Sequence, residues 1–347
     1  MKINERIEGL AMWGHALSAL LDEYETEGSD DGNPLRNIVQ EACRQNPWFT
    51  AGNCLRALKA IAHWLEKDQL MRWAGKYDQL RFEATVPKRV GLVMAGNIPA
   101  VGFHDLLSTL ISGNIAVVKC SSDDSVMIPF LTEVLLKVAP SFAGRIVISK
   151  RLEDIDAVIA TGSNNTSRYF DYYFRRYPHI IRKNRNSVAI LRGDESDADL
   201  RNLAEDIFSY FGLGCRNVSK LYVPAGYVFD RFFRAMEPYG DLMQHNKYMN
   251  NLDYHSALYL LNNEKFLTNN FLLLREHPAL ATPVSVVHYE VYANEEELSA
   301  KLEAERDAIQ CIVGGDYLPF GTSQQPGLAD YADGIDTVEF LMKLNNA

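Results

Sequence analysis

The stretch VGLVMAGNIPAVGFHDLLSTLISGNIAVVK, residues 90–119, sets the pattern that the rest of the chain repeats. An apolar run at 90–95 is followed by apolar residues at helical spacing over 99–112, and then by a second apolar run at 115–119. The stretch cannot span a membrane, because its polar residues include Asn97, His104, Asp105 and Asn114. We therefore interpret it as a strand, a helix and a second strand.

The same alternation continues through most of the chain. Further strands are predicted at 146–149, 157–161, 188–191, 218–223, 284–291 and 309–313. Further helices are predicted at 126–138, after Ser163, at 197–211, at 227–236 and at 295–305. Such alternation predicts an α/β fold with parallel sheets, in which ligands bind beyond the carboxyl ends of the strands.

Residues 1 to about 80 have a different pattern, that of helices without strands. All four tryptophans lie there, and we expect this helical arm to pack on the body of the protein or on a partner subunit. The predicted organisation is a helical arm at 1–85, a dinucleotide-binding domain at 86–213, a catalytic domain at 214–317, and a segment at 318–347 that returns to the body.

Composition excludes several classes of protein. The 347 residues suit two domains, and 35 basic against 45 acidic residues give a net charge of −10, which argues against nucleic-acid and membrane-surface binding. The five cysteines contain no C-x-x-C pair, so neither a disulfide framework nor a zinc site is indicated. With no apolar leader or membrane-spanning run, we expect a cytoplasmic protein.

Cys215 stands where a nucleophile can be displayed. The helical pattern of 197–211 runs into Gly212-Leu213-Gly214, and glycine allows the sharp turn that would bring the Cys215 thiol to a ligand. The alternative is an ordinary buried cysteine that acts as a small hydrophobic residue. This motif alone does not decide between the two interpretations.

Five short segments, taken in order, resemble a known superfamily. They are AGNIP at 95–99, VVKCSS at 117–122, ATGS at 160–163, GLGC at 212–215 and PFG at 319–321. From about Val90 to Leu341 the chain resembles a shortened aldehyde dehydrogenase, and within that superfamily the LuxC-type acyl-CoA reductases of bacterial luminescence. The resemblance implies a Rossmann-type cofactor domain with a parallel sheet and a second α/β domain that carries the nucleophile.

The resemblance also implies catalytic roles for Cys215 and Asn97. Cys215 would attack an acyl thioester and carry the acyl group as a second thioester. Asn97 would offer its side-chain NH₂ to the developing oxyanion, with the Cys215 backbone N–H as the second donor. The alternative for Asn97 is a helix N-cap, since asparagine is common at that position.

The cofactor-binding residues that the resemblance implies are Lys119, Ser121, Ser122, Thr161, Gly162, Ser163, Pro319 and Phe320. Lys119 would lie at the adenosine ribose, and Ser163 would open a helix whose N–H groups hold the pyrophosphate. NAD-preferring relatives often carry a glutamate at the position of Ser122. Its replacement by serine favours NADPH, with NADH as the alternative, although Asp123 follows directly.

Two departures from the superfamily pattern bear on the reaction. The segment 180–187, where aldehyde-oxidising relatives carry a base that activates water, contains no carboxylate, so the acyl-enzyme should hydrolyse slowly and wait for hydride. The segment 278–283 lacks the glutamate that would hold the nicotinamide ribose. The first departure favours reduction to an aldehyde, and the second predicts a differently anchored cofactor.

The predicted function is therefore NADPH-dependent reduction of an acyl thioester, such as a fatty acyl-CoA, to an aldehyde. One alternative is an aldehyde dehydrogenase acting on a small aldehyde, and another is a catalytically silent dinucleotide-binding or assembly protein. The basic residues Arg175, Arg176, Arg182, Lys183 and Arg185 would face phosphates of coenzyme A or NADPH, or form a solvated loop. We also expect a homo-oligomer and a protein partner that donates acyl groups.

Overall fold

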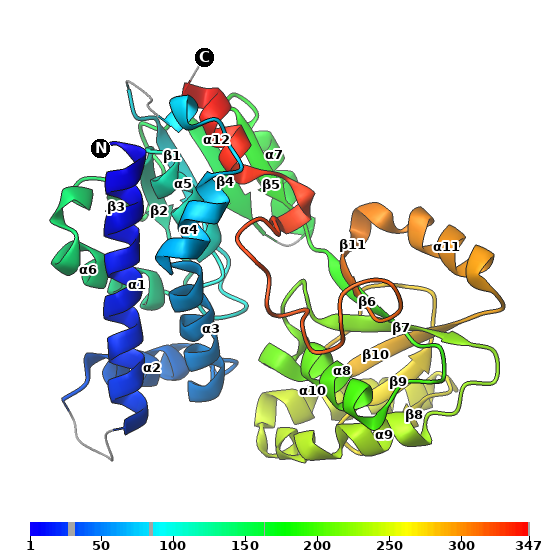
Figure 1. Cartoon of the computed structure of the whole chain (residues 1–347). Coiled ribbons are helices and arrows are strands. Elements are labelled where there is room, and N and C mark those ends of the chain that lie inside the picture. Colours follow the sequence, from blue (N-terminus) through cyan, green and yellow to red (C-terminus); the bar gives the residue numbers. More distant parts are fainter. Residues whose placement is uncertain (27–31, 83–85, 163, 346–347) are drawn as a thin grey trace. The chain divides into compact units, whose positions relative to one another are not determined.

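The computed structural model describes residues 1–26, 32–82, 86–162 and 164–345, and it divides the chain into two compact units (Figure 1). The first unit contains 1–183 and 327–347, and the second contains 184–326. Within the described part of the chain, every helix is too short or too polar to span a lipid bilayer.

The first unit is built on a parallel sheet of five strands. Their order across the sheet is β3 (Ile146–Ile148), β2 (Ile115–Lys119), β1 (Arg89–Val93), β4 (Ala157–Thr161) and β5 (His179–Arg182). The central strand β1 thus has β2 on one side and β4 on the other. This confirms the predicted α/β class, although β5 was not among the predicted strands.

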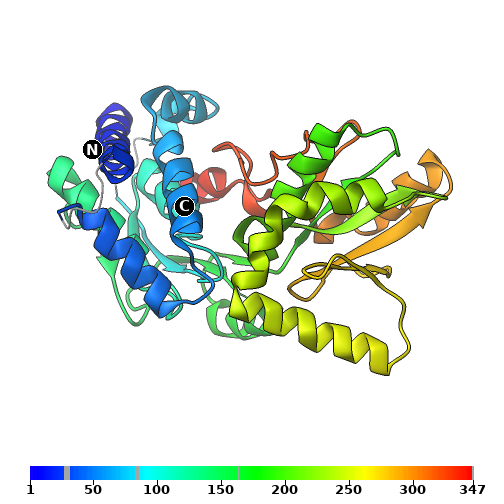
Figure 2. The same cartoon turned by 90° about the horizontal axis from the view of Figure 1, so that it is seen from below.

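Helices cover both faces of this sheet (Figures 1 and 2). On one face, side chains such as Leu92 and Val118 belong to a large core shared with α5, α6 and α12, and on the other face Val158 packs with Phe170 and Phe174 of α7. The helices of the unit are α1 (Ile3–Thr26), α2 (Pro34–Gln45), α3 (Ala51–Trp64), α4 (Lys67–Ala74), α5 (Phe103–Ile111), α6 (Met127–Val138), α7 (Asn164–Phe174) and α12 (Thr337–Asn345).

The N-terminal helices are part of the core of the first unit rather than a separate arm. Trp13 of α1 is fully buried, and Gly14 lies so close to Leu65 that an added Cβ would come within 2.7 Å of the Leu65 Cβ. The buried Arg6 donates hydrogen bonds to the Ile111 carbonyl at 2.7 Å and to the Phe82 carbonyl at 2.5 Å. Because its cation meets the carboxyl end of α5, this contact is favoured by the helix dipole.

The second unit has a sheet of six strands that is parallel except at one edge. In order, the strands are β11 (Ile309–Val313), β6 (Asn186–Ile190), β7 (Val218–Pro224), β10 (Val286–Tyr292), β9 (Leu273–Glu276) and β8 (Leu267–Thr268), with β8 antiparallel to β9. The helices are α8 (Asp197–Phe208), α9 (Asp230–Met236), α10 (Asn246–Leu261) and α11 (Glu295–Ala304). The sequence pattern did not indicate α10, β8 or β9.

The boundary between the units differs from the predicted one after residue 213. The strand β6 pairs with β7 and β11, and α8 packs on β7, so residues 184–213 belong to the second unit. Likewise, residues 318–326 belong to the second unit, and the chain returns to the first unit only at Gly327. Apolar periodicity identifies strands but does not say which neighbour each strand pairs with.

Arg182 holds the C-terminal segment of the first unit in place. Its side chain, 5% exposed, pairs with Asp105 at 2.7 Å and donates hydrogen bonds to the Ala332 carbonyl and the Thr337 hydroxyl. A buried guanidinium with these partners is structural, so Arg182 is neither a phosphate ligand nor part of a solvated loop.

Replacement of Arg182 should therefore destabilise the first unit. We expect Arg182→Ala to lower the free energy of unfolding by about 3 kcal/mol, because the Asp105 carboxylate stays buried without its partner. Denaturant unfolding measures the change. The control is Arg175→Ala in the same basic run, which removes an exposed arginine and should change stability by no more than about 0.5 kcal/mol. Equal effects of the two variants would contradict the structural role.

The second unit buries a polar cluster beside β10. Lys220, whose side chain is 0% exposed, pairs with Glu290 at 2.6 Å and with Glu305 at 3.3 Å. The His288 Nδ1 lies 2.8 Å from the Ala279 carbonyl, and its Nε2 is buried with no hydrogen-bond partner among the described residues. Burial lowers the pKa of His288 to about 4.

This histidine should make the second unit sensitive to acid. Between pH 6.5 and about 4 the unfolded chain binds a proton at His288 that the folded chain does not, so the free energy of unfolding should fall as the pH is lowered through that window. In denaturant unfolding as a function of pH, His288→Gln should flatten this dependence, whereas His63→Gln at an exposed position should not. An unchanged pH dependence in His288→Gln would show that other groups cause the acid sensitivity.

Candidate active site

Cys215 is exposed on a turn that follows α8 and the 3₁₀ turn η3 (Ser209–Gly212). The helix ends at Phe208, three residues before its predicted end, because Tyr210, Phe211 and Gly212 have φ values of 52°, 59° and 76°. A left-handed conformation costs a residue other than glycine roughly 1–2 kcal/mol. Both rings are buried, and Phe211 stacks on His245 with ring centroids 4.2 Å apart, which offsets the strain.

The carboxamide of Asn217 fixes this turn. Its Nδ2 donates to the carbonyls of Asp206, Ile207 and Ser209 at 3.1, 3.4 and 2.8 Å, and its Oδ1 accepts the Gly214 N–H at 2.8 Å. One side chain therefore binds the carbonyls of Asp206 and Ile207 in the last turn of α8 and that of Ser209 just after the helix, and it holds the segment that carries the cysteine. Asn217 is 2% exposed, so water does not compete for these bonds.

Ser187 connects the same segment to the sheet. Its hydroxyl donates to the Cys215 carbonyl at 3.0 Å and accepts the Cys311 N–H at 3.2 Å, and it lies 3.0 Å from the Cys311 sulfur. Because Ser187 lies on β6 and Cys311 on β11, these hydrogen bonds connect the backbone of Cys215 to two strands.

Of the predicted cofactor residues, Pro319 and Phe320 lie in the second unit with Cys215, in the loop after β11. Pro319 is exposed and Phe320 is half-buried. The Phe320 ring lies against Gly314, where an added Cβ would come within 2.5 Å of the ring.

The other described cofactor candidates and Asn97 gather at one edge of the first sheet. Val93 at the end of β1 pairs with Lys119 on β2 and with Ala160 on β4, so the segments that follow these strands lie at the same carboxyl edge. Lys119, Ser122 and Asn97 are exposed there, whereas Ser121, Thr161 and Gly162 are half-buried. Ser163 lies outside the described residues. The carboxyl edge is where parallel sheets bind ligands.

Asn97 is not the N-cap of the following helix. That helix, α5, begins at Phe103 with Gly102 at the cap, later than the predicted start at Pro99. The delay follows from Ala100, which has φ 51° and donates its N–H to the buried Asp124 carboxylate at 2.7 Å. The structure thus removes the capping alternative for Asn97, and its exposed side chain stays a candidate donor.

Comparison with known families decides what kind of protein this is. Residues 42–234, more than half of the chain, match the model of the acyl-CoA reductase (LuxC) family. The chain belongs to the LuxC acyl-CoA reductase family. It is therefore an aldehyde-forming oxidoreductase, and the matched span includes both Asn97 and Cys215.

Solved structures with the same fold are aldehyde dehydrogenases. Aldehyde dehydrogenase 21 of Physcomitrella patens, in complex with the reaction product succinate, has a TM-score of 0.65 at 13% identity and covers 99% of this chain and 84% of its own. The NAD-dependent aldehyde dehydrogenase of Sinorhizobium meliloti has a TM-score of 0.64 at 13% identity, and the match covers 90% of this chain and 70% of that protein. The indole-3-acetaldehyde dehydrogenase of P. syringae, in complex with NAD⁺, has a TM-score of 0.62 at 13% identity, and the match covers 89% of this chain and 71% of that protein. No curated protein matches the chain.

The histidines of this reductase have structural surroundings. His245 is the N-cap of α10, and its ring nitrogen accepts the Tyr248 N–H at 3.2 Å while the ring stacks on Phe211. Burial lowers the pKa of His255. His245 thus packs against Phe211 in the turn before Cys215, a contact that the sequence pattern did not indicate.

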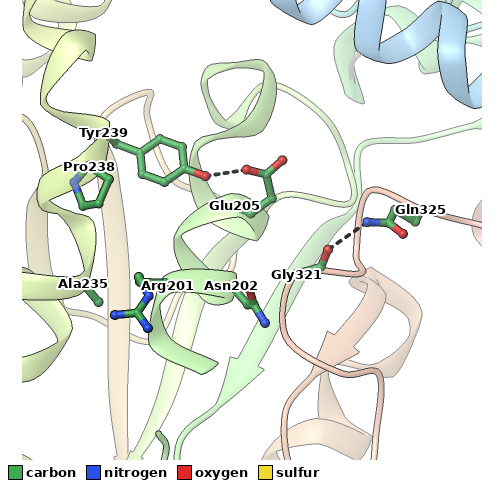
Figure 3. Close-up of a pocket in the computed structure, with 8 residues that line it drawn as sticks. All are labelled: Arg201, Asn202, Glu205, Ala235, Pro238, Tyr239, Gly321 and Gln325. Atoms are coloured by element: carbon green, nitrogen blue, oxygen red, sulfur yellow. Dashed lines mark hydrogen bonds between the residues drawn. The ribbon is translucent and has the colours of Figure 1, made fainter. Parts of the chain in front are cut away.

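The second unit has a pocket of about 460 Å³ that is lined in part by residues of α8 (Figure 3). Its lining residues are Arg201, Asn202, Glu205, Ala235, Pro238, Tyr239, Gly321 and Gln325. Tyr239 donates to Glu205, and the Gln325 amide donates to the Gly321 carbonyl at 3.3 Å. Cys215 does not line this pocket, but Gly321 connects it to the loop that carries Phe320.

Because Asn217 holds this turn, its replacement should affect both the stability of the second unit and the reactivity of Cys215. We expect Asn217→Asp to lower the free energy of unfolding of the second unit by about 2–4 kcal/mol, because a carboxylate would face three carbonyls that have lost their donor. The reactivity of Cys215 with iodoacetamide should change at the same time, whereas that of the other cysteines should not. Denaturant unfolding and alkylation rates measure the two effects, and an unchanged Cys215 rate in the folded variant would contradict the positioning role.

Proposed function

We propose that this reductase uses NADPH to reduce an acyl thioester, an acyl-CoA in the simplest case, to an aldehyde through an acyl group carried on Cys215. The observation that carries the proposal is an exposed thiol on a turn whose backbone is fixed by buried hydrogen bonds, within a chain of the acyl-CoA reductase family. A fixed nucleophile loses little freedom when it reacts.

In the first half of the proposed reaction, the Cys215 thiolate attacks the carbonyl carbon of the thioester, and the carbonyl electron pair moves to oxygen as the new C–S bond forms. Collapse of this oxyanion breaks the C–S bond to coenzyme A, and the departing thiolate takes up a proton. Because one thioester replaces another, the step is close to isoenergetic and needs a lower barrier rather than a driving force. The Cys215 N–H and the Asn97 carboxamide are the proposed donors to the oxyanion, each contributing about 3 kcal/mol.

The residues at the carboxyl edge of the first sheet fit NADPH. The exposed Lys119 ammonium and the Ser122 hydroxyl are suited to a 2′-phosphate, and Ser122 supplies no carboxylate that would repel it. When bound, the cofactor supplies the hydride that converts the acyl group to the level of an aldehyde. The exposed Asp123 stands next to these residues, so NADH remains the alternative.

Reduction rather than hydrolysis follows in this proposal from the residues of 180–187. Arg182 in this segment is buried against Asp105, and the segment itself contains no carboxylate to activate water. Base catalysis typically contributes roughly 10²–10⁴-fold, so an acyl-enzyme without it persists. Collapse of the thiohemiacetal after reduction then breaks the C–S bond, releases the aldehyde and restores Cys215.

We further propose that the protein acts in the cytoplasm as a homo-oligomer and receives acyl groups from a protein partner as well as from acyl-CoA. The cysteines support the location, because none of the five forms a disulfide.

Intact-protein mass spectrometry tests the proposed reaction. After mixing with a panel of acyl-CoA thioesters, the wild-type protein should gain the mass of one acyl group, and NADPH should then discharge it as aldehyde. Cys215→Ala should gain nothing, whereas the control Cys43→Ala should behave like the wild type. An adduct that survives in Cys215→Ala would contradict the assignment, and discharge as free acid would favour the aldehyde dehydrogenase alternative.

A further inference from the structure

Asp206 is a fully buried carboxylate near the end of α8. Its Oδ2 accepts the Gly321 N–H at 2.6 Å, and its Oδ1 accepts the Ser323 N–H at 2.9 Å. Burial raises the pKa of Asp206, while these hydrogen bonds oppose the rise. A buried carboxylate is costly unless it is hydrogen-bonded, so its place here depends on the loop that it holds.

The nucleophile segment, residues 214–217, also contacts the 319–323 loop. Arg216, the residue after Cys215, donates from Nε to the Ser323 carbonyl at 2.5 Å. Ser323 is thus bound through its N–H to Asp206 and through its C=O to Arg216. The backbone carbonyl of Asp206 in turn accepts from Asn217 at 3.1 Å. One residue therefore contacts both the 319–323 loop and the nucleophile segment.

The loop itself is folded as a rigid turn. Thr322 donates to the Pro319 carbonyl from its N–H at 3.3 Å and from its hydroxyl at 2.7 Å. Gly321 has φ 85°, and an added Cβ would lie 3.0 Å from the Asn202 Cβ on α8. The turn that presents Pro319 and Phe320 therefore packs on α8 and is hydrogen-bonded to Asp206.

We infer that Asp206 is a positioning residue that holds the 319–323 loop against the nucleophile segment, and that this contact is needed when the acyl group on Cys215 is reduced rather than when it is formed. The inference rests on the proposed function. Asn217 and Ser187 already fix the segment of Cys215 for attack, whereas the loop that carries the cofactor candidates Pro319 and Phe320 depends on Asp206 and Arg216. Loss of the Asp206 contact should leave the Cys215 thiol in place and displace the 319–323 loop.

The test compares Asp206→Asn with Asp199→Asn. Both replace an acid by its amide in α8, but Asp199 only completes the capping box at the exposed start of the helix. For Asp206→Asn, we expect the acyl adduct from acyl-CoA to form within about 2-fold of the wild-type rate and its discharge by NADPH to slow by at least about 10-fold, since small misplacements can cost about 10²-fold. Asp199→Asn should leave both rates unchanged.

Two results would overturn the inference. Formation and discharge could fall by the same factor in Asp206→Asn, as for a merely structural residue, or both could stay at the wild-type rate. If Asp206→Asn does not fold, Arg216→Ala removes the other bond to Ser323 and leaves both hydrogen bonds of the Asp206 carboxylate in place, and it should show the same selective loss of discharge.

The proposed function and this inference fail in distinguishable ways. If the wild type forms no adduct, the proposed function is wrong, and hydrogen exchange then tests the contact alone. The Gly321 and Ser323 amides should exchange faster in Asp206→Asn than in the wild type, while amides of β7 should not. Unchanged exchange at Gly321 and Ser323 would show that Asp206 does not hold the loop.

Discussion

The candidate site depends on the hydrogen bonds that Asn217 makes to backbone carbonyls at the end of α8. A helix that ends inside a unit leaves carbonyls without partners, and here one carboxamide, that of Asn217, binds two of them, on Asp206 and Ile207, together with the carbonyl of Ser209 just beyond the helix. The chain can then turn through the left-handed residues Tyr210 and Phe211 without leaving buried polar groups unpaired. The strain of this turn is offset by burial of the two rings, so the displayed cysteine and the hydrophobic core are energetically linked.

The same helix end also explains why two distant stretches of sequence act together. Residues near 215 and residues near 321 are separated by a large part of the second unit, yet both are anchored to Asp206. A backbone carbonyl and a side-chain carboxylate of one residue cannot move independently over long distances. The two segments are therefore coupled through α8, because both are hydrogen-bonded to the same residue of that helix.

The sequence predicted regular elements well wherever apolar residues alone determine them. The strands at 115–119, 157–161 and 309–313 have the predicted bounds. The misses have physical causes: residues other than glycine in left-handed conformations delay α5 at Ala100 and shorten α8 at Tyr210. The glycines before Cys215 indicated a turn that exposes this residue, and Cys215 is exposed on a turn within the family-matched span. Asp206 was not, because its partners lie more than 110 positions away and leave no local pattern.

Thioester chemistry gives a reason for fixing the nucleophile so firmly. Exchange of one thioester for another has almost no driving force, so in the proposed reaction the outcome is decided by barriers. A thiol on a fixed turn lowers the entropic part of the barrier to acyl transfer. The lack of a carboxylate in 180–187 leaves the barrier to hydrolysis high. In the proposed reaction, the acyl group therefore leaves as aldehyde because the competing route to acid is slower.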